Sequence, residues 1–285
     1  MTTRDLVKRG DRAFGPALRF IVFGGILVLG ATAPVQAQNG CTQGSLNGGY
    51  GYVLSGLQFP SPPSATGAGP VAAAGLIVFD GQGGLTARDT FNGGVTVSQR
   101  TGTGTYMVDS DCTGSSELGG DFGGLTFDLV IVSPGKELSL LVTNPGTVQP
   151  GIALTTGDEE CSLASFNGTY RNVRTDYLIA GFFSVVNTGL EVATIDGEGN
   201  IVFPPVTQSR NGVFSHPTAT GTYTVSSNCL IAFDLLVVDG TTSVRVHREG
   251  VVVDGGNQVW LVGATNPPSN AGTAQFKRMA EHPLH

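Results

Sequence analysis

The sequence predicts an all-β protein built from two tandem up-and-down antiparallel β-barrels of about eight strands each. Three observations support this class. A set of motifs occurs twice in the same order, short apolar–polar alternation fills the space between the motifs, and glycine-rich turns separate the alternating segments. A pair of β-sandwiches is the alternative architecture, because its strand count and turn spacing are similar.

The duplication is visible in motifs that return 116 to 122 positions later. The pairs are Cys41 with Leu46-Asn47-Gly48-Gly49-Tyr50 and Cys161 with Phe166-Asn167-Gly168-Thr169-Tyr170, the turns at 80–84 and 196–200, the strands at 103–108 and 220–225, and the Thr-Asn-Pro triplets at 143–145 and 265–267. The repeated unit of about 115 residues has the length of a domain. Solenoid repeats are shorter and recur every ~20–50 residues.

Each copy is expected to form a series of short strands. In the first copy they fall near 46–56, 71–79, 84–92, 95–108, 113–118, 124–132, 137–143 and 148–154. In the second they fall near 166–174, 178–186, 189–195, 200–209, 213–225, 230–237, 243–253 and 258–264, with a closing strand near 271–277. Turns such as Asp80-Gly81 and Pro134-Gly135 separate the strands, because glycine accepts the positive φ of tight turns. Within one strand, Phe127 and Leu129 share a face opposite Asp128, as a half-buried strand requires.

The first 37 residues have the pattern of a secretory signal peptide. A basic stretch precedes an uncharged apolar run from Phe20 to about Ala33, and Pro34-Val35-Gln36-Ala37 supplies the small residues of a cleavage site. A run of this length is short for a membrane span, which needs roughly 20 residues. We therefore expect no membrane span after cleavage and a secreted or periplasmic protein.

The expected organisation is a signal peptide at 1–37, a first barrel at 39–155, a linker at 156–160, a second barrel at 161–277 and a tail at 278–285. Cleavage would remove five of the 15 basic and two of the 22 acidic residues, leaving 10 against 20 and a net charge of −10. A chain this acidic is a poor candidate for binding nucleic acid or anionic membranes.

The four cysteines form one equivalent pair in each copy. In an exported protein, an even and repeat-symmetric set of cysteines indicates disulfides. Four cysteines allow three pairings, and the duplication favours Cys41–Cys112 and Cys161–Cys229. No metal site is expected, because the cysteines lack metal-ligand spacing and the Asp196-Gly197-Glu198-Gly199-Asn200 turn lacks the bidentate Glu of a calcium loop.

Two short motifs carry a resemblance to known barrels. The Gly-x-Tyr elements at 48–50 and 168–170 are similar to the Gly-x-Trp opening of lipocalins and other calycins, with Tyr in place of Trp. The Gly-Thr-Tyr strands at 104–106 and 221–223 resemble those of allene oxide cyclase-like barrels, and the spacing from Cys to Gly-Tyr resembles that of uncharacterised secreted bacterial tandem-repeat proteins. The resemblance implies a barrel with a small apolar cavity, and it implies no particular activity.

Aromatic side chains are the candidate ligand-binding residues. They are Tyr50, Tyr52, Tyr106, Tyr170, Tyr223, Phe182, Phe183 and Trp260. Trp260 is expected either to line a pocket or to pack between the two domains, because it aligns with Ser139 on a normally polar face. An eight-stranded barrel is at the size limit between a filled core and room for one small ligand.

The leading functional hypothesis is an exported, non-catalytic protein that binds a small apolar ligand or acts structurally at the cell exterior. The first alternative is a surface adhesion module that exposes Phe182, Phe183 and Trp260. The second is a cyclase or isomerase of the allene oxide cyclase type. We lean against an enzyme and expect no cofactor, because the two copies share no reactive constellation and all four histidines follow residue 215. The oligomeric state is not predicted.

Overall fold

The structure is a computed structural model of the chain and describes residues 40–60, 68–157, 160–180, 183–265 and 271–280. Residues 1–39, which include the predicted signal peptide, residues 61–67 and Phe182 lie outside this part, and the side chains at 178–180 and 183–185 are not described. No helix in the described part is long and apolar enough to cross a membrane.

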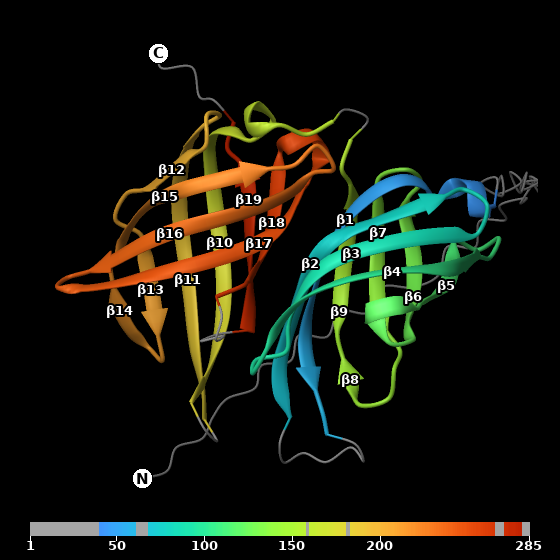
Figure 1. Cartoon of the computed structure of the whole chain (residues 1–285), viewed down its shortest axis with the longest axis horizontal. Coiled ribbons are helices and arrows are strands. Elements are labelled where there is room, and N and C mark those ends of the chain that lie inside the picture. Colours follow the sequence, from blue (N-terminus) through green and yellow to red (C-terminus); the bar gives the residue numbers. More distant parts are fainter. Residues whose placement is uncertain (1–39, 61–67, 158–159, 181–182, 266–270, 281–285) are drawn as a thin grey trace, which may run out of the picture. The chain divides into compact units, whose positions relative to one another are not determined.

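The first copy forms a closed barrel of eight antiparallel strands, which confirms the predicted fold class and excludes the sandwich for this copy (Figure 1). Its strands, in ring order, are β1 (Asn47–Gln58), β2 (Gly69–Asp80), β3 (Gly84–Asn92), β4 (Val97–Val108), β5 (Thr113–Leu118), β6 (Leu125–Ser133), β7 (Glu137–Val142) and β9 (Pro150–Thr155). β1 pairs with both β2 and β9, and this pairing closes the ring. The short β8 (Thr147–Val148) adds to the end of β1.

The second copy forms an equivalent barrel of eight strands. They are β10 (Asn167–Ala180), β11 (Phe183–Asp196), β12 (Asn200–Phe203), β15 (Thr218–Val225), β16 (Leu230–Asp239), β17 (Thr242–Val253), β18 (Gln258–Gly263) and β19 (Ala271–Arg278). A hairpin of β13 (Thr207–Arg210) and β14 (Val213–Ser215) extends β11. The ring closes through the pairing of β10 with both β11 and β19.

Several strand boundaries of the second copy differ from the sequence prediction. The segments expected at 200–209 and 213–225 are each divided in two, because Pro204, Pro205 and Pro217 lack the N–H that a ladder needs. The strands expected at 166–174, 178–186 and 189–195 are instead two long strands, β10 and β11. The prediction placed breaks at polar residues such as Asp176 and Asn187, but these two residues pair with each other across the ladder.

One end of each barrel is closed by a short 3-10 helix and a buried tyrosine. The helices are η1 (Gln43–Ser45) and η3 (Leu163–Ser165), and two more turns, η2 (Gly120–Phe122) and η4 (Asp254–Gly256), lie between strands. The Tyr106 hydroxyl donates to the carbonyls of Gln43 and Leu46, both at 3.0 Å. In the second barrel the Tyr223 hydroxyl makes the equivalent bonds at one end of the lumen.

The predicted disulfides Cys41–Cys112 and Cys161–Cys229 are both present and join positions 71 and 68 residues apart. In the chain-entropy model, a crosslink that closes a loop of this length stabilises the folded state by about 4 kcal/mol. Disulfides of this kind persist in oxidising compartments outside the cytoplasm.

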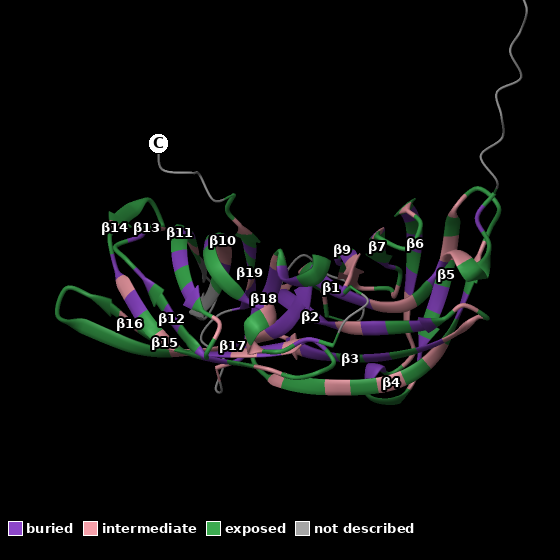
Figure 2. Ribbon diagram, turned by 90° about the horizontal axis from the view of Figure 1, so that it is seen from above, coloured by how far each residue is buried: buried purple, intermediate pink, exposed green. Residues whose placement is uncertain are grey.

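The two barrels share a packed seam. Outward-facing Val53, Ala72 and Ala74 of the first barrel belong to the same buried cluster as Val251 and Trp260 of the second. Figure 2 shows buried residues gathered where β1 and β2 meet β17 and β18. At the edge of the seam, the Asn92 side chain donates to the Gly263 carbonyl at 2.8 Å, and the Gln99 amide donates to Glu249 at 3.1 Å.

Candidate ligand-binding site in the second barrel

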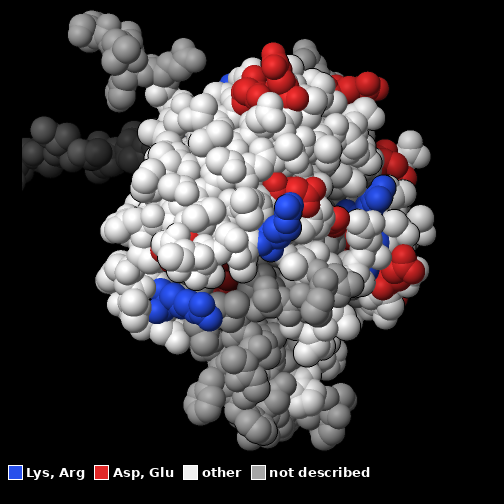
Figure 3. Space-filling model, turned by 60° about the vertical axis from the view of Figure 1, so that its left-hand side comes forward, with Lys and Arg blue, Asp and Glu red and all other residues white. Residues whose placement is uncertain are grey.

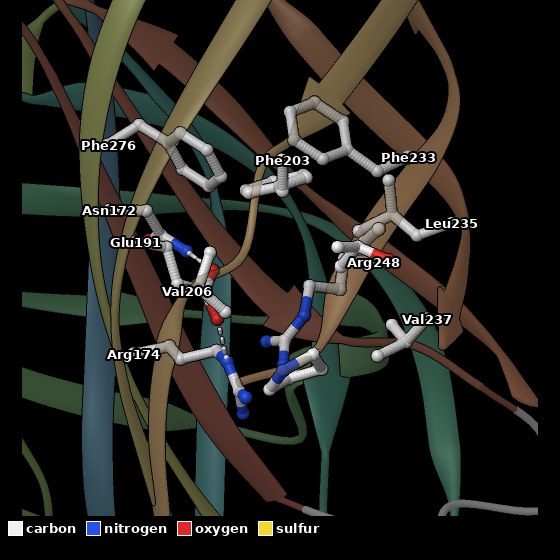
Figure 4. Close-up of a pocket in the computed structure, with 13 residues that line it drawn as sticks. Asn172, Arg174, Glu191, Phe203, Val206, Phe233, Leu235, Val237, Arg248 and Phe276 are labelled. Atoms are coloured by element: carbon white, nitrogen blue, oxygen red, sulfur yellow. Dashed lines mark hydrogen bonds and ion pairs between the residues drawn. The ribbon is translucent and has the colours of Figure 1, made fainter. Parts of the chain in front are cut away.

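The lumen of the second barrel contains two connected hollows. The inner one has a volume of about 40 Å³, and the outer one, towards the open end, has about 430 Å³. Arg174, Val237 and Arg248 line both, so these three side chains form the constriction between them. Figure 4 shows Arg174 and Arg248 entering this space from opposite walls.

The inner hollow has apolar walls. Phe203, Phe233 and Phe276 line it together with Val206 and Leu235 (Figure 4). The Phe276 ring lies 5.5 Å from Phe233 and 6.1 Å from Phe203, in edge-to-face contacts that fix the shape of the wall. A water-sized group needs about 10–15 Å³, so the inner hollow has room for about three groups of this size.

A charged network separates the two hollows. The Arg174 guanidinium donates from Nε to Glu191 at 2.6 Å and from Nη1 to Asp176 at 2.7 Å. Arg248 donates from Nη2 to both oxygens of Asp176, at 2.8 and 3.0 Å. The Asn172 amide donates to the second oxygen of Glu191 at 2.7 Å.

The electrostatics of this network favour the ionised form of Arg174. Burial alone would lower the pKa of Arg174, but Glu191 and Asp176 outweigh it and leave the pKa above its usual value. Two guanidinium groups face two carboxylates, so the network is balanced in formal charge. Removing these charged groups from water costs free energy. A gain in the stability of the fold therefore does not explain why the network is present.

The network leaves Arg248 and Asn172 incompletely satisfied. The exposed fraction of Arg248 is 5 %, and neither its Nη1 nor the Asn172 Oδ1 has a hydrogen-bond partner among the described residues. A buried donor without a partner costs about 1–3 kcal/mol, and more for a charged group. The unsatisfied donor lies on a residue that lines both hollows, where an acceptor on a bound molecule can reach it.

Comparison of the two copies shows which residues of the first barrel correspond to this network. Aligned by the repeated motifs, Arg174, Asp176, Glu191 and Arg248 occupy the positions that hold Leu54, Gly56, Gly75 and Phe127 in the first barrel. The backbone registers agree, because Gly75 pairs with Tyr52 as Glu191 pairs with Asn172. These four positions therefore hold apolar side chains or glycine in one copy and charged side chains in the other.

The first barrel is filled at the corresponding depth. The Tyr52 hydroxyl donates to Asp89 at 2.6 Å, and Arg100 holds the same carboxylate with two bonds of 2.6 and 2.9 Å. The Arg100 guanidinium lies over the Phe91 and Phe122 rings, at 4.3 and 4.7 Å from their centroids. Burial, followed by the charge of Asp89, raises the pKa of Tyr52 well above its usual value, so its proton stays in place. This cluster is paired within the protein and acts as a plug.

Six of the eight aromatic residues proposed from the sequence have described side chains, and none of the six lines the inner hollow. Tyr50, Tyr52, Tyr106, Tyr170 and Tyr223 are buried inside the two barrels, and all but Tyr50 donate their hydroxyls to groups of the protein. Trp260 is 1 % exposed and packs in the seam, so it contributes to no exposed aromatic patch. Phe182 lies outside the described residues, as does the side chain of Phe183 at the start of β11.

The lining residues missed by sequence reasoning are Arg174, Asp176, Glu191 and Arg248. A signal for two of them was present, since 174 and 176 continue the inward phase set by Tyr170. Polar residues at these positions were interpreted as a strand end, whereas they point into a lumen. Within the described residues, no three His, Cys, Asp or Glu side chains gather closely enough to hold a metal ion.

Comparison with known proteins adds no family to this description: no protein-family model matches the chain, and no curated protein matches its sequence. The fold and the lumen therefore carry the functional argument.

Proposed function

We propose that the second barrel binds one small, mainly apolar molecule that carries a hydrogen-bond acceptor. The observation that carries the proposal is the buried Nη1 of Arg248, which has no partner among the described residues and lies on the wall of a mainly apolar hollow. Specific small-molecule sites combine apolar walls with a few placed polar groups in this way.

In this proposal each part of the ligand has its own place. A short apolar end fits among Phe203, Phe233 and Phe276, the acceptor meets Arg248, and the remainder occupies the outer hollow. An uncharged acceptor such as a carbonyl fits best. Both oxygens of Asp176 already accept hydrogen bonds from Nη2 of Arg248. The formal charges of the network also cancel without any charge on the ligand.

The first barrel has a structural role in this proposal, because the Tyr52–Asp89–Arg100 plug leaves its core paired. The two disulfides support a place of action outside the cytoplasm, and we assign the protein to the periplasm or the cell exterior on that basis.

A first experiment is native mass spectrometry of the protein purified from its own host without denaturation, compared with the same sample after denaturing extraction. We expect a stoichiometric excess mass that extraction removes. In parallel, the extracted protein is refolded, its fold is checked by circular dichroism, and it is titrated with the uncharged fluorophore N-phenyl-1-naphthylamine. We expect saturable binding of one molecule per chain.

The control uses two neighbouring positions on β15. Ala219 lines the inner hollow, and the next residue, Thr220, is exposed on the outer wall. Ala219→Leu is expected to fill the hollow and weaken fluorophore binding at least tenfold, whereas Thr220→Leu leaves binding unchanged. Equal binding by both variants would place the fluorophore outside the lumen and remove the support for a binding barrel.

A further inference from the structure

Two buried polar atoms on the wall of the inner hollow lack partners in the described chain, and they are of opposite kinds. Arg248 Nη1 only donates hydrogen bonds, whereas Asn172 Oδ1 only accepts them. The two residues are 5 and 2 % exposed, and both line the inner hollow. Because each atom is without a partner among the described residues, the two do not satisfy each other. A molecule that satisfies both must bring an acceptor and a donor.

The direction of the Asn172 amide is set by Glu191. Asn172 Nδ2 donates to the Glu191 carboxylate at 2.7 Å, and the other oxygen of that carboxylate accepts from Arg174 Nε at 2.6 Å. A carboxylate accepts hydrogen bonds and donates none, so the nitrogen of the amide must face Glu191. The amide oxygen is therefore held away from Glu191 and is available to a donor on a bound molecule.

The first barrel shows what this position holds when the lumen is filled. Tyr52 stands at the position of Asn172, since Tyr52 pairs with Gly75 as Asn172 pairs with Glu191. The Tyr52 ring is buried in the core of the first barrel, and its hydroxyl donates to Asp89. Asn172 is much shorter than tyrosine. At the same depth, the second barrel therefore has an open volume and an amide oxygen that receives no hydrogen bond from the described residues.

The two atoms belong to facing sides of the hollow. Asn172 is on β10 and Arg248 is on β17, and β19 and β18 separate these two strands in the ring. Figure 4 shows the two residues on opposite sides of the space that the phenylalanine rings line. In a trans secondary amide, the N–H and C=O groups point to opposite sides of one planar unit. Such a unit donates to one wall and accepts from the other.

Size and charge also fit an uncharged amide. The inner hollow of about 40 Å³ has room for about three water-sized groups, which correspond to an N-methyl group, its N–H and the carbonyl carbon. The formal charges of the arginine–carboxylate network cancel without a ligand. On the side of the described molecule turned forward in Figure 3, the charged residues form small separate groups. This side therefore has no concentrated charge that would attract an ionic ligand.

We propose that the ligand of the second barrel is a secondary amide, whose N–H donates to Asn172 Oδ1 and whose carbonyl accepts from Arg248 Nη1. A small substituent on the amide nitrogen lies among the phenylalanines of the inner hollow, and the acyl chain extends past the constriction into the outer hollow. The inference rests on the proposed function, because it specifies the chemistry of the molecule that this barrel is proposed to bind.

The test compares three small molecules that differ in a single group. N-Methylhexanamide, methyl hexanoate and 3-octanone carry N–H, O and CH₂, respectively, between a methyl group and the same hexanoyl group. Each is titrated into the refolded protein loaded with N-phenyl-1-naphthylamine, and the loss of fluorescence gives its affinity. We expect the amide to bind at least about tenfold more tightly than either analogue, because only the amide gives Asn172 Oδ1 a donor.

A variant of Asn172 assigns the preference to this residue. Asn172→Leu removes the acceptor at similar side-chain size, so the preference for the amide should be lost. Arg171→Leu is the matched control, because Arg171 precedes Asn172 on β10 and is exposed on the outer wall. It should retain the preference. Circular dichroism checks the fold of both variants, and the three-molecule comparison on the unchanged protein decides the inference by itself if Asn172→Leu does not fold.

Failure of this inference differs from failure of the proposed function. If the fluorophore binds but the amide displaces it no better than the ester and the ketone, the binding barrel stands and the secondary amide is wrong. Ordered water would then satisfy Asn172 and Arg248. A preference for the amide that persists in Asn172→Leu would also overturn the assignment. If neither the fluorophore nor any of the three molecules binds, the proposed function fails, and this inference fails with it.

Discussion

Replacing Gly51 by alanine tests whether the two barrels are joined as the structure describes. Gly51 lies on β1, and a Cβ at this position would come within 2.3 Å of Val253 Cγ1 and within 2.7 and 2.8 Å of the two Val251 methyl groups. Valine has little rotamer freedom, and both valines belong to a closed barrel, so the contacts are relieved only by opening the seam. Overpacking of this size costs about 1–3 kcal/mol.

The assay follows urea-induced unfolding by circular dichroism and by the fluorescence of Trp260, the only tryptophan in the chain. We expect Gly51→Ala to lower the unfolding midpoint and to shift Trp260 emission to longer wavelength, because water enters the seam around the indole. Gly69→Ala is the matched control, since its Cβ would meet nothing within 4 Å. At Gly69 the substitution should be neutral or stabilise the protein by about 0.4–1 kcal/mol, through the unfolded state. An unchanged midpoint and emission for Gly51→Ala would refute the packed seam.

Two further predictions concern buried tyrosines and the effect of pH. Tyr52→Phe removes a bond to the buried Asp89 carboxylate and should lower the free energy of unfolding by about 1.5–3 kcal/mol in urea titrations, whereas Tyr50→Phe, whose hydroxyl has no partner in the described chain, should be neutral or stabilising. A cost for Tyr50→Phe equal to that of Tyr52→Phe would contradict this assignment. Burial lowers the pKa of His247, but hydrogen bonds to Glu249 and Asp234 outweigh it and raise the pKa above the usual 6.5. The folded state then binds more protons than the unfolded state, so this stabilisation is complete below about pH 6.5 and disappears as the pH rises through the raised pKa. We expect an effect below about 1 kcal/mol, because the ring is about one-third exposed, and it should vanish in His247→Gln but persist in His216→Gln when unfolding midpoints are measured against pH.

The fold class, the duplication and both disulfides were predictable because each depends on a local pattern. Alternation of apolar residues fixes which face of a strand is buried, and glycine at positions such as Gly81 and Gly197 fixes the turns. The equivalent cysteines Cys112 and Cys229 even share the same left-handed backbone conformation, with φ of 68° and 67°. A pattern that occurs in both copies indicates the same local structure twice, and each copy supports the prediction made for the other.

The candidate site was not predictable in the same way, because it depends on what lies opposite each strand. Arg174 and Arg248 are 74 positions apart in the chain and meet only when the barrel closes through β10 and β19. Alternation identifies a residue as inward-facing, but it does not tell whether the interior at that depth is filled or open. For Trp260, likewise, the sequence shows an aromatic on an outward face and does not show the alanines of the other barrel that cover it.

The two copies differ in how the charged side chains inside each barrel are paired. Inside the first barrel, Asp89 is held by Tyr52 and Arg100, and the plug needs no other molecule. Inside the second barrel, the Nη1 of Arg248 has no acceptor among the described residues. After duplication of a closed barrel, one copy can stabilise the fold. The interior of the other copy can then hold a charged lumen in place of an apolar core. The cost of burying two arginines and two carboxylates is then carried by a domain that is anchored through its seam to a neighbour with an apolar core of its own.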